Sequence, residues 1–120
     1  MEHSFERLLR FLARVPAIQA GVGTGALGDT GWYAKFSIDI RHRLAWHVVQ
    51  EFGHVLNYPG INDRMPTVFK PVSPPPYLND GPDEFLSWVI ECSDSSFTPE
   101  DATEWLEAGF LFRYRTNRNG

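Results

Sequence analysis

The spacing of apolar residues along the chain predicts three helices. An apolar stripe at intervals of three and four residues predicts the first helix over residues 4–15, with Ser4 as its N-cap. Residues 44–57 repeat this period, with a broad apolar arc opposite a polar one. The third helix is predicted to begin at Thr98 and Pro99, a capping residue followed by proline, and to end at Gly109. The first stripe consists of Phe5, Leu8, Leu9 and Leu12.

Three shorter segments are predicted to be strands. The clearest is "WYAKFSIDI", residues 32–40, in which apolar side chains alternate with mostly polar ones. The segment "FLSWVIEC", residues 85–92, has the same period of two. The segment "TVFKPV", residues 67–72, predicts a short strand near a sheet edge, because Pro71 lacks an N–H group. Residues 20–31 contain five glycines and few side chains able to pack, so we expect a connector there.

Together these elements predict an α+β domain of two layers. Its sheet would have three strands, or four if the C-terminal segment adds an edge strand, with helices on one face and the order α-β-α-β-β-α. The 120 residues are enough for one domain with a single core. The expected parts are an N-terminal helix (1–15), a Gly-rich connector (20–31), an α+β core (32–108) and a tail (110–120).

Charge is unevenly distributed along the chain. The formal net charge is −4, yet residues 71–112 carry nine acidic residues and no Lys or Arg. A stretch of one sign repels phosphate groups and attracts basic proteins, so direct nucleic-acid binding is disfavoured. The lone Cys92 cannot form an internal disulfide, and no secretory or membrane segment is recognisable. We therefore expect a cytoplasmic protein that does not bind membranes.

The glycine-rich segment "GVGTGALG", residues 21–28, contains the spelling of a dinucleotide-binding fingerprint. In that fingerprint the glycines follow a strand and open a helix, whose N-terminus faces the pyrophosphate. Here they follow a predicted helix and lead into a predicted strand, and Asp29 adds negative charge. A structural connector therefore explains the glycines better, and we expect no cofactor.

A possible metal site lies on the second predicted helix. His47, Glu51 and His54 stand at positions i, i+4 and i+7, so they share one helix face and could ligate a divalent metal. A metal-binding protein or small enzyme using this face is our alternative hypothesis. The solvated face of an amphipathic helix explains the same residues and is favoured. We assign no catalytic residue, since Cys92 is expected to be buried and no serine carries a nucleophile-elbow sequence.

The proline-rich segment "SPPPYLNDGPDE", residues 73–84, is predicted to be a loop that stiffens the chain between two strands. Tyr77, Asn79 and Asp80 are candidates to line a small-molecule cleft beside it. The sequence offers no chemical clue to such a ligand.

Three segments together carry a resemblance to known sequences. "GWYAKFSIDI", "LAWHVVQEFGHVLNYPG" and "PTVFKPVSPPPYLNDGPDEFLSWVIE" resemble a group of small uncharacterised bacterial proteins, over most of residues 31–108. The resemblance implies a compact cytoplasmic α+β domain. It implies no activity, cofactor or catalytic residue.

The favoured hypothesis is a non-enzymatic protein–protein interaction domain. In one form it is an immunity- or antitoxin-like inhibitor whose acidic surface binds a basic protein, with salt-sensitive affinity. In the other form it self-associates across a two-fold axis, through its wet sheet face or through unpaired strand edges. The candidate contact residues are Glu100, Asp101, Glu104, Glu107, Tyr33 and Trp46.

Overall fold

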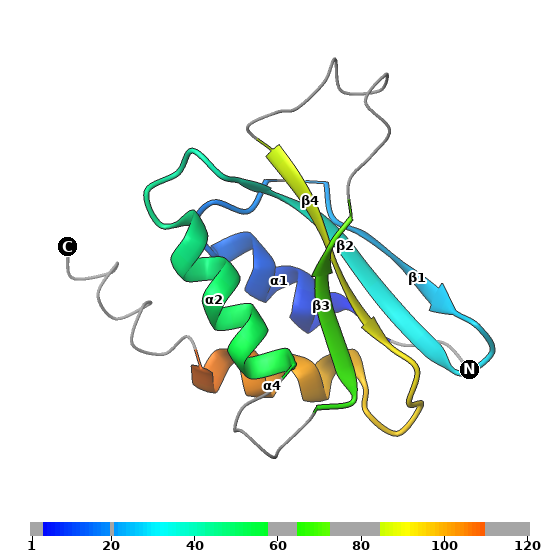
Figure 1. The fold of residues 1–120 in the computed structure, drawn as a ribbon. Coiled ribbons are helices and arrows are strands. Elements are labelled where there is room, and N and C mark those ends of the chain that lie inside the picture. The colour runs from blue at the N-terminus through cyan, green and yellow to red at the C-terminus, as the bar shows by residue number, and fades with distance from the viewer. Residues whose placement is uncertain (1–3, 20, 58–64, 73–84, 110–120) are drawn as a thin grey trace, which may run out of the picture.

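The computed structural model describes residues 4–19, 21–57, 65–72 and 85–109 (Figure 1). The element order is α-β-β-α-β-β-α. The helices are α1 (Glu6–Arg14), α2 (Ala45–Leu56) and α4 (Pro99–Gly109). The strands are β1 (Gly23–Leu27), β2 (Gly31–Asp39), β3 (Thr67–Pro71) and β4 (Phe85–Cys92).

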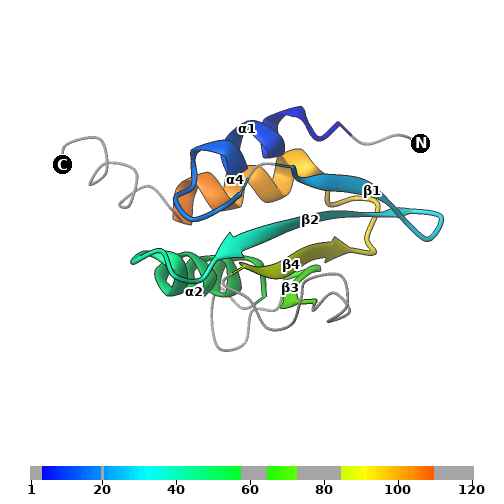
Figure 2. The ribbon, with the colours of Figure 1, turned by 90° about the horizontal axis from the view of Figure 1, so that it is seen from above.

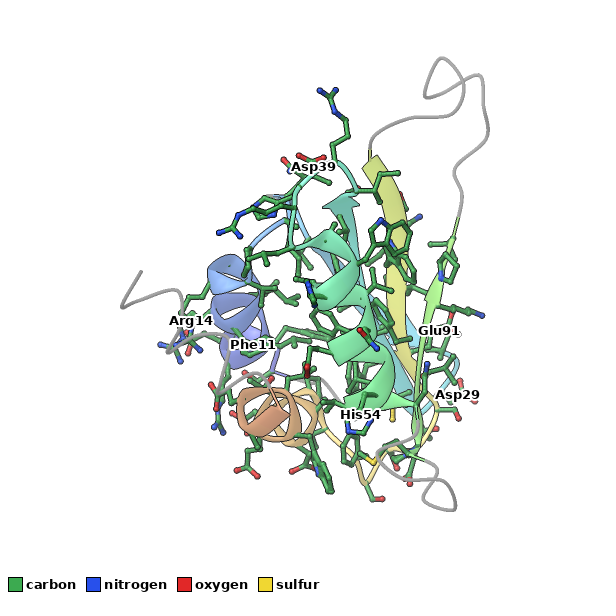
Figure 3. The ribbon with its side chains drawn as sticks, turned by 60° about the vertical axis from the view of Figure 1, so that its left-hand side comes forward. Phe11, Arg14, Asp29, Asp39, His54 and Glu91 are labelled. Atoms are coloured by element: carbon green, nitrogen blue, oxygen red, sulfur yellow. The ribbon has the colours of Figure 1, made fainter. Side chains whose placement is uncertain are left out.

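The predicted α+β architecture is confirmed, with a four-stranded sheet in the order β1-β2-β4-β3. Every neighbouring pair of strands is antiparallel, so β2 and β3 run in the same direction on either side of β4. The three described helices lie on one face of the sheet (Figures 2 and 3). Helix α1 packs on α4, α4 packs on α2, and α2 packs on β3.

The fourth strand comes from the Gly-rich segment, where we expected a connector. Strand β1 forms a hairpin with β2 in a register that runs from Gly23 opposite Lys35 to Leu27 opposite Gly31. The turn between them begins at Gly28, whose φ of +64° favours glycine. The segment 110–120, from which we predicted a possible fourth strand, lies outside the described residues.

Pairing along β2 also continues upstream of β1. Ile18 bridges Ile38, the Gln19 N–H donates to the Ser37 carbonyl (3.0 Å), and the Asp39 N–H donates to the Ala17 carbonyl (2.8 Å). Strand β2 is therefore hydrogen-bonded on both of its sides, to β4 on one and to residues 17–19 and 23–27 on the other. It is one of the two inner strands of the sheet, with β4.

The core lies between the inner face of the sheet and the helices. Alternation along β2 directs Trp32, Ala34, Phe36 and Ile38 inward, and each is at most 3% exposed. A row of rings continues this core from α2 across β3 to β4: the ring centroids of Phe52 and Phe69 are 5.0 Å apart, and those of Phe69 and Trp88 are 4.8 Å apart. Such pairs stabilise a fold by about 0.5–1.5 kcal/mol each beyond the area they bury.

Helix α1 differs from its prediction in two details. Ser4 is not its cap, because Phe5 occupies the N-cap position and no side chain caps the helix there. The buried stripe is also rotated relative to the predicted one. Phe11 is fully buried, whereas Leu9 is 37% exposed at the side of the helix.

Gly31 occupies a crowded position at the start of β2. A Cβ atom there would collide with the Cys92 carbonyl oxygen and would lie 2.8 Å from the Leu27 carbonyl oxygen. Both are backbone atoms of neighbouring strands, so neither can move away without shifting the sheet. At Gly23, by contrast, an added Cβ would meet no atom within 4 Å.

We predict that Gly31→Ala lowers the free energy of unfolding by about 2 kcal/mol or more, the cost of an overpacked core position. Urea denaturation followed by circular dichroism measures this change. Gly23→Ala is the matched control and should cause no loss of stability. Equal midpoints for the two variants would contradict the packing of β2 against Cys92.

Candidate interaction surface

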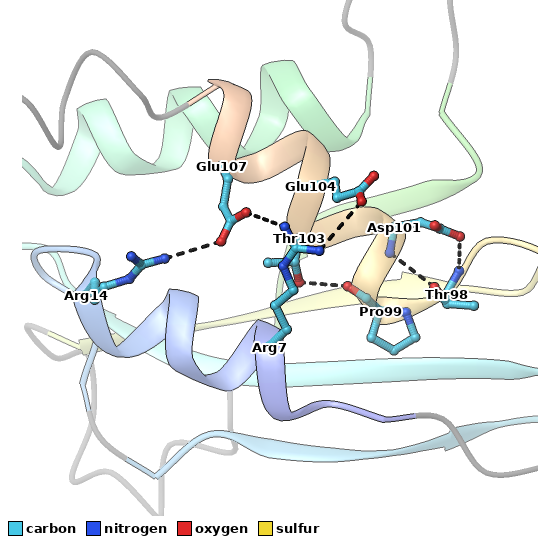
Figure 4. Close-up of polar contacts among 8 residues, drawn as sticks. All are labelled: Arg7, Arg14, Thr98, Pro99, Asp101, Thr103, Glu104 and Glu107. Atoms are coloured by element: carbon cyan, nitrogen blue, oxygen red, sulfur yellow. Dashed lines mark hydrogen bonds and ion pairs between the residues drawn. The ribbon is translucent and has the colours of Figure 1, made fainter.

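One of the four predicted acidic contact residues, Asp101, forms hydrogen bonds at the start of α4. The Asp101 N–H donates to the Thr98 hydroxyl (3.1 Å), and the Thr98 N–H donates to the Asp101 carboxylate (2.9 Å), as Figure 4 shows. This is a reciprocal capping box, so the predicted helix start is confirmed. The Asp101 carboxylate is thus committed to the helix terminus.

Two further acids of α4 face arginines of α1 (Figure 4). Glu107 accepts a hydrogen bond from Arg7 (2.7 Å) and forms an ion pair with Arg14 (3.4 Å). Glu104 forms a longer ion pair with Arg7 (3.6 Å). The hydrogen bond to Glu107 raises the pKa of the Arg7 guanidinium above its ordinary value. These contacts join α1 to α4 and neutralise part of the acidic face.

Glu100 is the fourth predicted acid, and it is exposed. Trp105, also on α4, is 47% exposed, and Trp46 at the start of α2 is 57% exposed. Tyr33 lies on the opposite face of the sheet, because its neighbours Trp32 and Ala34 point inward. The sheet therefore separates Tyr33 from the helical contact residues, and the predicted set does not form one continuous surface.

The ligands of the alternative metal-site hypothesis all lie on α2. His47 and His54 are exposed on α2, and Glu51 is half-buried on the same helix. Within residues 4–19, 21–57, 65–72 and 85–109, no three His, Cys, Asp or Glu side chains are grouped so as to hold a metal ion. The candidate ligand-loop residues Tyr77, Asn79 and Asp80 lie outside the described residues.

Cys92 is a buried residue at the end of β4, as predicted. It is 1% exposed, and its Sγ donates to the carbonyl oxygens of Asp94 (3.4 Å) and Phe97 (3.5 Å). Burial raises the pKa of the Cys92 thiol, because the thiolate loses its hydration inside the core. This environment suits a structural thiol and opposes a nucleophilic one.

The outer face of the sheet is uncovered by any described helix (Figure 2). It carries Tyr33, Lys35 and Ser37 from β2, and these alternate with the buried core residues. Across the sheet, Lys70 of β3 forms an ion pair with Glu91 of β4 (3.3 Å). The face is thus mixed in polarity.

The edge of the sheet at β3 is blocked at Phe69 and at Pro71. The side-chain amide of Asn57 pairs with the backbone of Phe69: the Phe69 N–H donates to Oδ1 (2.7 Å), and Nδ2 donates to the Phe69 carbonyl (3.1 Å). Asn57 thus imitates a neighbouring strand. Pro71, the next residue of β3 whose backbone points outward, has no N–H to offer.

The opposite edge, at β1, is open. The Ser37 carbonyl and the Asp39 N–H face the β1 side of β2. Every second residue of a strand directs its N–H and C=O groups to the same side, so those of Tyr33 and Lys35 also face β1. Their partners Gly25 and Gly23 then form hydrogen bonds with β2. The N–H and C=O groups of Thr24 and Ala26 therefore point away from β2, toward the free side of the edge. No described residue forms a hydrogen bond with these groups of Thr24 or Ala26.

An uncharged cleft borders the same edge, between α1 and the segment that leads into β1. Its volume is about 390 Å³, and none of the described residues that line it is charged. A second cleft, of about 490 Å³, lies at the arginine-rich side of α1. The first cleft is lined by Leu9, Leu12, Ala13, Ile18, Gln19, Gly21 and Val22.

The sequence analysis considered unpaired edges but did not identify which strand carries one. The available signal was the absence of charge and of proline in residues 21–28, which is unusual for an exposed edge. Asn57 gave no signal, because its bonding to Phe69 depends on how α2 sits beside β3.

Comparison with known proteins returned no relationship for this chain. It matches no protein-family model, and no significant match was found among curated proteins or solved structures. These results are consistent with an uncharacterised family. Among the described helices, none is long and apolar enough to cross a membrane.

Because the pKa of Cys92 is raised in the folded protein, we expect the free energy of unfolding to decrease at alkaline pH. Above about pH 8.5, the ordinary pKa of a thiol, the unfolded chain loses its proton while the folded protein keeps it. The buried thiol therefore makes its full contribution to the free energy of unfolding below that pH, and this contribution falls as pH rises further.

We predict that the stability gap between the native chain and Cys92→Ala narrows from about pH 7 to about pH 10 as the unfolded thiol ionises. Urea midpoints at several pH values measure the gap. All other titrating groups are shared by the two proteins, so their effects cancel. A gap that stays constant with pH would contradict the burial of this thiol.

Proposed function

We propose that the chain is a non-enzymatic protein–protein interaction domain that binds through the open side of its sheet, at the edge formed by β1. One observation carries the proposal: the two edges of the same sheet are treated differently. The β3 edge is closed by Asn57 and Pro71, whereas Thr24 and Ala26 of β1 leave their backbone groups free.

Free strand edges are templates for strand addition, and proteins usually protect them with charge, proline or a covering element. Strand β1 has none of these protections among the described residues. An added strand would gain hydrogen bonds with Thr24 and Ala26, each contributing about 0.5–1.5 kcal/mol net. The neighbouring uncharged cleft, which Leu9 and Leu12 help to line, lies beside the position of that strand.

The acidic form of the hypothesis has weaker support. Glu104 and Glu107 already form ion pairs with α1, and Asp101 caps α4. A basic partner would compete with Arg7 and Arg14 for these carboxylates. Glu100 and the half-exposed Trp105 are the remaining features of α4 that favour this form.

We predict that Ala26→Pro abolishes partner capture, including capture of an untagged copy of this chain. Proline removes an N–H that no described residue uses, so the fold should persist while the edge loses a donor. Tagged native and variant chains are compared as baits in lysate of the source organism, with retained proteins measured by mass spectrometry.

Glu100→Gln is the matched control and should capture the same proteins as the native chain. Circular dichroism and thermal unfolding confirm that both variants are folded. Binding through the edge should survive a wash at about 1 M salt, which screens exposed charges. Full capture by Ala26→Pro, combined with loss in Glu100→Gln or at high salt, would place the binding surface on α4 instead.

A further inference from the structure

Resting on that proposed function, the geometry points to a specific occupant of the edge: β1 of a second copy of this chain. We infer that two β1 strands pair antiparallel across a two-fold axis at Gly25. The two four-stranded sheets then join into one continuous sheet. Three features support this occupant: the symmetry of the β1 edge, its lack of charge and the blocked edge at β3.

The free groups of β1 are placed symmetrically. Thr24 and Ala26 lie on either side of Gly25, and both present N–H and C=O groups outward. In the two-fold register, Thr24 lies opposite the partner's Ala26, and each such pair exchanges two hydrogen bonds. Gly25 then faces the partner's Gly25 in the closely spaced type of pair, with Cα atoms about 4.5 Å apart.

The chemistry of the edge also fits a copy of itself. Residues 21–28 carry no charge, although the chain as a whole carries −4. Two copies therefore meet where like charges do not come face to face, and their small side chains do not collide. A charged strand from another protein would find no ion-pair partner within residues 21–28.

The blocked edge at β3 limits this assembly to two copies. A chain with two open edges could add copies at both, which leads to filaments. Here the backbone N–H and C=O groups of Phe69 are already hydrogen-bonded to Asn57, and Pro71 has no N–H group to donate. Each copy therefore contributes one open edge, at β1. Self-pairing at β1 is isologous and closes after one step.

The same register brings the partner copy next to the uncharged cleft. Counting outward from Gly25, the partner's turn at Gly28 and Asp29 comes opposite Val22 and Gly21, which line the cleft. Leu9, at 37% exposure, borders this position. On the outer face, the Tyr33 ring lies over Gly25, since a Cβ there would be 2.8 Å from its Cε2 atom. The two Tyr33 rings thus flank the axis.

The test is cysteine cross-linking in the full chain. Thr24→Cys and Ala26→Cys are prepared as separate proteins, mixed and oxidised. Cα atoms in such hydrogen-bonded pairs are about 5.5 Å apart, which a disulfide spans. The inference predicts a cross-linked dimer in the mixture, at least several-fold more abundant than in either protein alone. The native chain, with its buried Cys92, is the blank.

Sedimentation analysis provides the second measurement. The native chain should show twice the 13.7 kDa chain mass, and Ala26→Pro should show about half of the native value while remaining folded. Cross-linking within Ala26→Cys alone, without enrichment in the mixture, would overturn the two-fold register at Gly25.

A native chain that stays monomeric up to about 1 mM would overturn self-pairing altogether. If Ala26→Pro still lost a captured protein in that case, the proposed function would stand with a different occupant. If the native chain is monomeric and Ala26→Pro captures everything that it does, both the function and the occupant are wrong.

Discussion

The structure depends on strand β2, which is hydrogen-bonded on both of its sides. Its inward residues, from Trp32 to Ile38, are buried beneath the helices, and this burial is a large contribution to the core. The aromatic row from Phe52 to Trp88 then extends the same core to β3 and β4. Without β2, strand β1 would lose its pairing partner, and only the β3–β4 pair of the sheet would remain.

Building outward from the two inner strands leaves two edges, and the chain treats them unequally. On the β3 side, α2 ends at Leu56 and the next residue, Asn57, reaches the Phe69 backbone. On the β1 side, the chain arrives from α1 through a glycine-rich segment that contributes little side-chain volume. The edge is therefore bare, and α1 stands beside it with Leu9 half-exposed.

Much of this fold was accessible from the sequence. The period of two in residues 32–40 and 85–92 predicted β2 and β4, and Thr98 marked the start of α4, because each signal is local. Strand β1 was not predicted, since alternating Gly, Thr and Ala give no hydrophobic period. Its pairing is imposed by β2 and the turn at Gly28, which are tertiary features. The exposure of Leu9 likewise depends on how α1 rotates against the sheet.

The candidate surface was harder to predict, for an electrostatic reason. The acids of residues 100–107 formed the strongest one-signed cluster in the sequence, so they suggested an interaction face. A linear sequence does not show that Arg7 and Arg14 of α1 lie against them.

Once Glu104 and Glu107 are paired internally, the described residues still carry an unsatisfied neutral feature, the backbone groups of Thr24 and Ala26. Hydrogen bonds between neutral backbone groups depend on register and shape, and they respond weakly to salt. Association through β1 would therefore leave the α1–α4 ion pairs undisturbed, whereas association through α4 would have to break them. The intramolecular pairing of Arg7 with Glu107 thus favours the sheet edge over the acidic helix as the site of the proposed interaction.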